Sequence, residues 1–283
     1  VYVAMKSNTE QLKEYTDYVI NRHFPSVQSE ENPYLELVSS VIDRQVDLIV
    51  NWMRVGFIHG VMNTDNMSIP GETIDYGPCA FMDNYAPDTV FSSIDQYGRY
   101  SFENQREIGG WNLARFAESL ITLVDPDENR AIKLLNTTLE QYKDTFERKY
   151  NEMMAAKIGL VAPTDEDNQL VQELLDIMKS NRLDYTYTFR NLKTKNIPEL
   201  EGWYEKWDSR AVDFTLMDST NPTVIPRNHI VENAISQAGN HGNMVPLLEL
   251  INVQKEPYSD SAPSYFKNPP ESVNETYKTY CGT

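Results

Sequence analysis

Residues 56–78 read GFIHGVMNTDNMSIPGETIDYGP, and this stretch decides how the whole chain is interpreted. Before it, apolar residues recur every three or four positions, as in a helix, and after Gly56 this period breaks. Two short segments, 67–69 and 73–74, flank Pro70-Gly71, a pair that supplies the dihedral angles of a tight turn. The stretch therefore predicts two short strands joined as a small β-hairpin.

Such a hairpin would bring two oxygen-bearing side chains together. Asn66 precedes the first strand and Asp75 follows the second, so doubling the chain back would place them side by side. An amide oxygen and a carboxylate suit Mg²⁺, which keeps several waters and takes few protein ligands beside phosphate oxygens. We therefore predict that Asn66 and Asp75 are metal ligands. Gly77 would let the chain turn sharply away behind them.

The order of these residues resembles the catalytic loop and metal motif of protein kinases. Kinases place a base Asp after a His, an Asn beyond that base, and an Asp-Phe-Gly motif after a hairpin. Here His59, Asn66 and Asp75-Tyr76-Gly77 follow that order, but Val61 occupies the base position, and valine cannot accept a proton. A carboxylate reappears at Asp65, displaced along the loop, from where it would approach a substrate at another angle.

Three further polar residues have structural interpretations that we favour. His59 is expected to pack and hydrogen-bond beneath the loop rather than to act as an acid or base. Arg99 and Arg227 are candidates for buried ion pairs or for phosphate contacts. Ion pairing is favoured because the chain carries many acidic side chains.

Outside the central stretch the pattern is mainly helical. Apolar residues at spacings of three or four predict a helix from about residue 33 to 55 and another along 132–153. Ser7 and Glu10 have the spacing of a capping box, which predicts a helix near the N-terminus. The fold class expected is mainly α, with one small β-hairpin at the metal site.

The composition limits the classes of protein to be considered. The chain has 25 basic and 42 acidic residues, a formal net charge of −17, so a nucleic-acid-binding surface is not expected. Apolar residues make up 40%, which supports a packed core. No apolar run approaches the roughly 18 residues that suggest a membrane span, so no membrane partner is expected. Without a signal-peptide pattern and with only two cysteines, we expect a cytoplasmic location.

Several blocks together resemble the selenoprotein O family. The first is the long string from Gly56 to Ile69 with Thr73–Pro78, which is too specific for chance. The likeness continues in four other places: Tyr97–Gln105, Asp184–Thr186 with Thr188–Arg190, Asn221-Pro222 with Arg227-Asn228, and a cysteine third from the end. It spans most of the chain.

The resemblance implies a fold and an activity. Members of that family have a protein-kinase-like fold and transfer AMP from ATP to Ser, Thr or Tyr hydroxyls of proteins. It implies that Asn66 and Asp75 bind Mg²⁺, or else Mn²⁺, and that Asp75 also lies near the ATP. It implies that Asp65 is the general base that takes the proton from the target hydroxyl.

The family also has an N-terminal lobe that holds the phosphates, and this sequence contains no glycine-rich phosphate motif. Lys6 precedes a helix and does not stand in a Val-Ala-x-Lys strand. We therefore expect a kinase-like C-terminal lobe without its N-terminal lobe. It would have a helical body at 1–255 and an extended tail at 256–283. On its own this chain is expected to bind ATP weakly or not at all and to have no measurable transferase activity.

Other interpretations stay open at this point. UMP or phosphate could be transferred on the same fold, although Val61 weakens the phosphotransfer version. A non-catalytic, kinase-like scaffold is a third possibility, but a scaffold would not need Asp65, Asn66 and Asp75 together. The cysteines Cys79 and Cys281 could form a disulfide that tethers the tail over the site.

Overall fold

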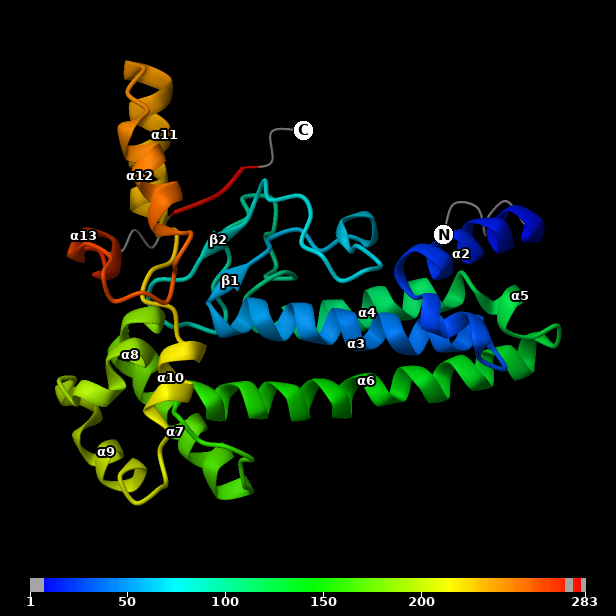
Figure 1. The fold of residues 1–283 in the computed structure, drawn as a ribbon, viewed down its shortest axis with the longest axis horizontal. Helices are drawn as coiled ribbons and strands as arrows, with labels where there is room; N and C mark the ends of the chain where they lie inside the picture. Colours follow the sequence, from blue (N-terminus) through cyan, green and yellow to red (C-terminus); the bar gives the residue numbers. More distant parts are fainter. Residues whose placement is uncertain (1–7, 273–276, 281–283) are drawn as a thin grey trace. The chain divides into compact units, whose positions relative to one another are not determined.

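The computed structural model describes residues 8–272 and 277–280, and Figure 1 shows its ribbon. It is mainly helical, with 61% helix and 4% strand, as predicted. In chain order the elements are α2 (Thr9–His23), η1 (Pro25–Ser29), α3 (Pro33–Arg54), β1 (Phe57–Ile58), η2 (Thr64–Asn66), β2 (Ala80–Phe81), α4 (Gln105–Glu118), α5 (Ile121–Val124), α6 (Glu128–Lys157), α7 (Asp165–Asn181), α8 (Tyr185–Asn191), η3 (Leu192–Thr194), η4 (Pro198–Leu200), α9 (Glu201–Trp207), α10 (Phe214–Thr220), α11 (Asn228–His241), α12 (Val245–Val253) and α13 (Ser264–Lys267).

The described residues form two compact units. Unit 1 holds the residues up to Val50, with Val61–Tyr76 and Asn104–Lys149. Unit 2 holds Asn51–Gly60, Gly77–Glu103 and the residues from Tyr150 onward. The predicted division at residue 255 stays a prediction. No helix in the described part of the chain has both the length and the apolar character needed to cross a bilayer.

Unit 1 is built on three helices, α3, α4 and α6, of which α3 and α6 run alongside each other in Figure 1. The apolar stripe of α3 is fully buried, with Val46 and Ile49 at 0% exposure. Gly109 allows α4 to come close to its neighbours, because a Cβ there would overlap Ile49 of α3 and Tyr142 of α6. At the surface, Lys149 of α6 lies 2.7 Å from an Asp47 oxygen of α3.

The helix α2 of unit 1 begins where a side chain can satisfy its free amides. Asn8 is the N-cap, and its side chain accepts a hydrogen bond from the Gln11 amide at 2.9 Å. The predicted cap, Ser7, lies outside the described residues. The helix buries Leu12, Val19 and Ile20.

The two-stranded sheet lies in unit 2 rather than at the predicted hairpin. Phe57 pairs with Phe81 and Ile58 with Ala80, antiparallel, and the pairing brackets the whole 59–79 segment. The predicted strands at 67–69 and 73–74 are reduced to one isolated bridge, Met67 with Thr73. On the turn side of this bridge, the Ser68 carbonyl accepts from the Gly71 amide and from Gln45 instead of from a partner strand.

Unit 2 contains a fully buried arginine, Arg227, that bonds to two carboxylates. One Arg227 nitrogen lies 2.7 Å from Asp83 and 2.7 Å from Asp184, and the guanidinium also donates to the Lys267 carbonyl. Burial raises the pKa of Asp83, although Arg227 opposes this rise. The predicted ion pair of Arg227 is confirmed. The prediction for Arg99 is wrong as regards burial, because that side chain is exposed and its backbone amide is held by Asp95.

A second buried cation, Lys157, has no carboxylate within salt-bridge distance among the described residues. Its Nζ donates to the Arg54 carbonyl at 2.7 Å and lies 4.2 Å from the ring centroid of Phe189 and 4.8 Å from that of Tyr185. Burial, reinforced by the charge of Arg54, holds the pKa of Lys157 well below its ordinary value.

Replacing Arg227 is expected to destabilise the chain strongly. Arg227→Met would leave Asp83 and Asp184 buried without a counter-charge, so we expect a loss of about 3–5 kcal/mol in the free energy of unfolding. Chemical denaturation at neutral pH measures this loss. The exposed Arg22→Met variant is the matched control and should stay within about 0.5 kcal/mol of wild type. Equal stabilities of the two variants would contradict the ion-pair assignment.

Lys157 should make stability depend on pH. Its pKa is lowered in the folded state from 10.5, so between the two pKa values the unfolded chain binds more protons, and stability rises with pH toward 10.5. We expect the wild type to gain stability relative to Lys157→Met between about pH 7 and about pH 9, in urea titrations. Lys143→Met, an exposed control on α6, should show no such pH-dependent difference.

Candidate functional site

The three predicted site residues, Asp65, Asn66 and Asp75, lie in unit 1 on one reversal of the chain. The antiparallel bridge pairs Met67 with Thr73. Beyond this bridge the chain leaves the strand conformation, because Thr64–Asn66 form the short helix η2 on one side and Asp75 has a φ of +55° on the other. The bridge therefore joins the two arms that carry the site residues, with Asn66 directly before Met67 and Asp75 two residues after Thr73.

The turn that closes this reversal requires glycine at Gly71. Its φ is +77°, in the region that side chains disfavour, and its amide donates to the Ser68 carbonyl at 2.9 Å. A Cβ at this position would lie 2.9 Å from the Arg44 carbonyl oxygen and 2.9 Å from the Arg44 Cβ, which belong to α3. The turn is thus pressed against a rigid helix, which fixes the place of the loop.

Asn66 ends the short helix η2 with its amide already oriented. Its Nδ2 donates to the Val61 carbonyl at 3.1 Å, and its backbone amide donates to Asn63 at 3.0 Å. Because Nδ2 is committed to Val61, Oδ1 faces away from that carbonyl. Oδ1 has no hydrogen-bond donor among the described residues, so it is available to a ligand.

Asp75 has an exposed side chain and an unusual backbone conformation. Its φ is +55°, in the left-handed region, which a residue with a Cβ rarely adopts. Such strain costs on the order of 1 kcal/mol or more and is concentrated at functional sites. Ala162, Arg182 and Lys195 adopt the same region, so the conformation alone does not single out Asp75.

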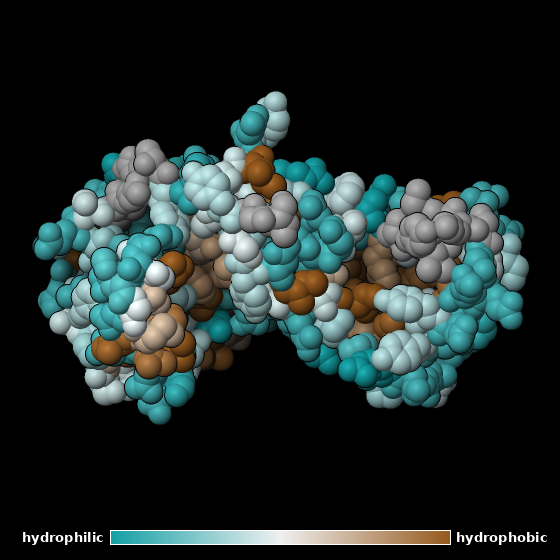
Figure 2. All heavy atoms as spheres, turned by 90° about the horizontal axis from the view of Figure 1, so that it is seen from above, coloured by the Kyte–Doolittle hydropathy of each residue, from teal (hydrophilic) through white to brown (hydrophobic). Residues whose placement is uncertain are grey.

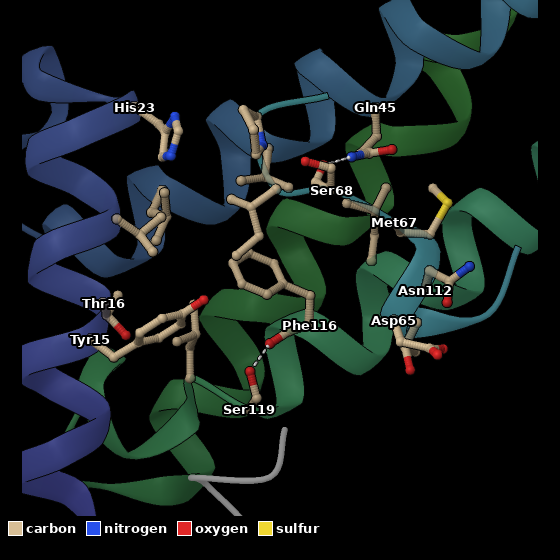
Figure 3. Close-up of a pocket in the computed structure, with 18 of the residues that line it drawn as sticks. Tyr15, Thr16, His23, Gln45, Asp65, Met67, Ser68, Asn112, Phe116 and Ser119 are labelled. Atoms are coloured by element: carbon tan, nitrogen blue, oxygen red, sulfur yellow. Dashed lines mark hydrogen bonds between the residues drawn. The ribbon is translucent and has the colours of Figure 1, made fainter. Parts of the chain in front are cut away.

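Asp65 is exposed and lines a cavity of about 590 Å³ in unit 1 (Figure 3). Its carboxylate makes no hydrogen bond or ion pair with any other described residue. A carboxylate that is accessible and not committed to a structural partner can accept a proton from an incoming group.

Two buried amides that hold this loop, Asn112 of α4 and Gln45 of α3, were missed by sequence reasoning. Asn112 Nδ2 donates to the Met62 carbonyl at 2.9 Å and to the Ile108 carbonyl at 3.0 Å, and Gln45 Nε2 donates to the Ser68 carbonyl. Both interrupt the apolar stripe of their helix at positions where a hydrophobic residue is expected, and that interruption is the signal that could have indicated them.

A metal at this site would rest on few protein ligands. The described residues contain no group of three or more His, Cys, Asp or Glu side chains that could hold a metal ion. The amide oxygen of Asn66 and the carboxylate of Asp75 are hard donors of the kind that Mg²⁺ takes when phosphate oxygens and water complete its shell. The donor set fits Mg²⁺, and the shared ion stays a prediction.

Comparison with known proteins assigns the family. Residues 2–209 match the family described as "Protein adenylyltransferase SelO". The chain belongs to the SelO family. Among its relatives are proteins named "Protein nucleotidyltransferase YdiU": one from Pelagibacter ubique is 46% identical over 299 aligned positions, and one from Clostridium botulinum is 45% identical over 299. A third, from Rhizobium meliloti, is 44% identical over 306 positions.

These SelO-family relatives are longer than the chain. Each alignment covers 100% of this sequence, but only 61–62% of the Pelagibacter, Clostridium and Rhizobium proteins. The chain therefore spans about three fifths of the length of the curated relatives that it matches. What their names say about activity is a property of those proteins.

The histidine of the SelO-family motif, His59, lies in unit 2 and is fully buried. Its ring centroid is 5.3 Å from that of Trp52 and 6.3 Å from that of Phe57. The neighbouring Gly60 has a φ of +85°, and a Cβ there would lie 2.6 Å from the Pro78 carbonyl oxygen. A histidine enclosed by aromatic rings and tight backbone packs beneath the chain, as the structural interpretation expected.

The segment at 277–280 is held against the residues that follow the motif in unit 2. Thr279 forms a parallel bridge with Ser92, and its hydroxyl donates to the Pro78 carbonyl at 2.6 Å. Cys79, the next residue after Pro78, is half-buried. Cys281 lies outside the described residues, so the disulfide between the two cysteines stays a prediction.

Intact mass checks the disulfide directly. Under oxidising conditions without reductant, a bridged chain is about 2 Da lighter than the reduced chain, and a tryptic map would contain a peptide that joins Cys79 to Cys281. Cys79→Ser should abolish both signals. Two free thiols under the same conditions would remove the idea of a tethered tail.

Proposed function

We propose that this chain carries the catalytic loop of an Mg²⁺-dependent protein adenylyltransferase, which transfers AMP from ATP to Ser, Thr or Tyr hydroxyls of other proteins. The observation that supports it most is the bridge between Met67 and Thr73, because Asn66 directly precedes one arm of this reversal and Asp75 lies two residues after the other. Membership of a family described as protein adenylyltransferases supports the same reaction. A protein-kinase-like lobe and a cytoplasmic location belong to this proposal.

Each residue has a distinct role in the proposed reaction. Asn66 Oδ1 and the Asp75 carboxylate would hold Mg²⁺, which neutralises charge on the phosphates when it is bound. Asp65 would take the proton as the hydroxyl oxygen of the protein forms a bond to the α-phosphorus of ATP. The bond from that phosphorus to the bridging oxygen breaks, and pyrophosphate leaves.

The position of the carboxylates favours this reaction over ordinary kinase chemistry. Val61 stands at the position where kinases carry their base. Its side chain is buried and has no group that accepts a proton. The available carboxylate, Asp65, stands on the arm of the reversal opposite Asp75. Transfer of UMP from UTP would use the same residues, so the site residues do not separate it from AMP transfer.

Labelled ATP tests the proposal. The full gene product and the 283-residue chain are each incubated with protein substrates and with ATP labelled at either the α or the γ phosphorus. We expect label on protein from the α position only, and its loss in Asp75→Ala, because the metal ligand is removed. Asp65→Asn should lower kcat roughly 10²–10⁴-fold. The exposed α6 variant Asp144→Asn is the matched control.

The outcomes separate the alternatives. Label transferred from the γ position alone would establish a kinase and contradict the proposal, and transfer from UTP alone would favour UMP. We expect the 283-residue chain by itself to be inactive. AMP transfer by that chain, abolished by Asp75→Ala, would contradict this expectation.

A further inference from the structure

The cavity beside Asp65 is larger than one carboxylate needs. It occupies about 590 Å³ within unit 1 and is enclosed by α2, α3, α4 and the loop from Thr64 to Ile74. Figure 3 shows Asp65 and Asn112 at one end of it, with Phe116 between that end and α2. In Figure 2 hydrophobic side chains line a hollow on the side of the molecule where α2 lies.

The walls of this cavity are apolar and reach the surface. Leu12 of α2, Val41 of α3 and Met67 of the loop contribute to its lining. At its rim Tyr15 is 55% exposed and Ile74 is 39% exposed. A soluble protein rarely leaves contiguous apolar surface open unless another molecule covers it.

Two polar atoms of the lining lack hydrogen-bond donors. Asn112 Oδ1 and Gln45 Oε1 are buried and have no partner among the described residues, although the amide nitrogens of both side chains are bonded. Because both oxygens are inaccessible to solvent, they do not open into the cavity, and these two amides serve to hold the loop through their nitrogens.

The charge at the rim differs from that of the whole chain. Arg22, in the last turn of α2, lines the cavity, is exposed and makes no ion pair with any described residue. The chain as a whole carries a formal charge of −17. Arg22 therefore offers an acidic group a favourable position on a protein that otherwise repels it.

These features favour a protein segment over a nucleotide. The phosphates of a nucleotide need several cations, whereas the lining offers Arg22 and His23 together with the carboxylate of Asp65. A polypeptide matches the lining better, with an apolar side chain for the walls and a carboxylate for Arg22.

We propose that this cavity is the docking site for the protein that is modified. It would receive a large apolar side chain of an extended segment, with an acidic residue of that segment at Arg22 and the target hydroxyl at Asp65. The inference rests on the proposed function, because that function assigns Asp65 as the group that meets the hydroxyl. It adds a substrate class: hydroxyl residues with a large apolar residue and an acidic residue nearby.

Peptide binding tests the docking site without any catalysis. The probes are fluorescein-labelled peptides with one central Ser. Phe is placed at each flanking position in turn, and the reference peptide has Asn at the same position. Each peptide also carries a single Glu or a single Lys. Fluorescence anisotropy against the purified chain, in the absence of ATP, gives Kd. We expect Phe at one or two positions to lower Kd about tenfold, and Glu peptides to bind more tightly than Lys peptides.

Variants connect this binding to the cavity. The rim substitutions Tyr15→Ala and Ile74→Ala together should remove most of the Phe preference, and Arg22→Glu should reverse the preference for Glu over Lys. Matched controls lie elsewhere: Tyr97→Ala, at a residue that is 94% exposed, and Lys143→Glu on α6 should leave both preferences unchanged. Circular dichroism confirms that each variant is folded.

Each outcome decides the inference. It would be overturned if no peptide bound, if the Phe preference survived in the Tyr15/Ile74 variant, or if adenosine displaced the bound peptide and its own binding were lost in that variant. Peptide binding that persists while no AMP is transferred would sink the proposed reaction but not the docking site. AMP transfer to peptides that shows no preference for Phe would support the proposed reaction and contradict the docking site.

Discussion

The close approach of Gly71 to α3 is the constraint on which the candidate site depends. The turn at residues 70–71 packs so closely on the backbone of Arg44 that a side chain at Gly71 would overlap it. The single bridge between Met67 and Thr73 then joins the two arms of the reversal. Gln45, one position further along α3, donates to the Ser68 carbonyl and ties the same turn from the side. The contacts of Arg44 and Gln45 with the turn thus hold the reversal where a regular hairpin would be held by its own ladder.

The helices could be predicted from the sequence because their apolar spacing records a buried face. The α3 helix was expected at 33–55 and runs over Pro33–Arg54. The sheet could not be predicted, because alternation over two or three residues is too short to show pairing. Met67-Ser68-Ile69 alternates and Phe57-Ile58 does not, yet the ladder forms at Phe57-Ile58, with a partner more than twenty residues away in the sequence.

In the site, some residues could be predicted from their type, whereas others take their role only from packing. Asp65, Asn66 and Asp75 were identified because their chemistry and order along the chain carry meaning. Asn112 and Gln45 were missed because an amide on a helix acquires its role only from the carbonyl that it reaches, and Met62 and Ser68 are remote in sequence. The cavity has the same origin, since no local pattern records a space enclosed by three separate helices.

The valine at position 61 leaves the proton-accepting role to another residue of the loop. In the kinase pattern the base precedes the metal-binding Asn by several residues, and Val61 removes it. The remaining carboxylate, Asp65, adjoins Asn66 directly and lies two residues before the bridge at Met67, so its position depends on the reversal rather than on the earlier part of the loop. A base placed there also borders the apolar cavity. Proton acceptance and recognition of an apolar side chain would then depend on the same turn, and a change that loosens Gly71 from Arg44 would disturb both.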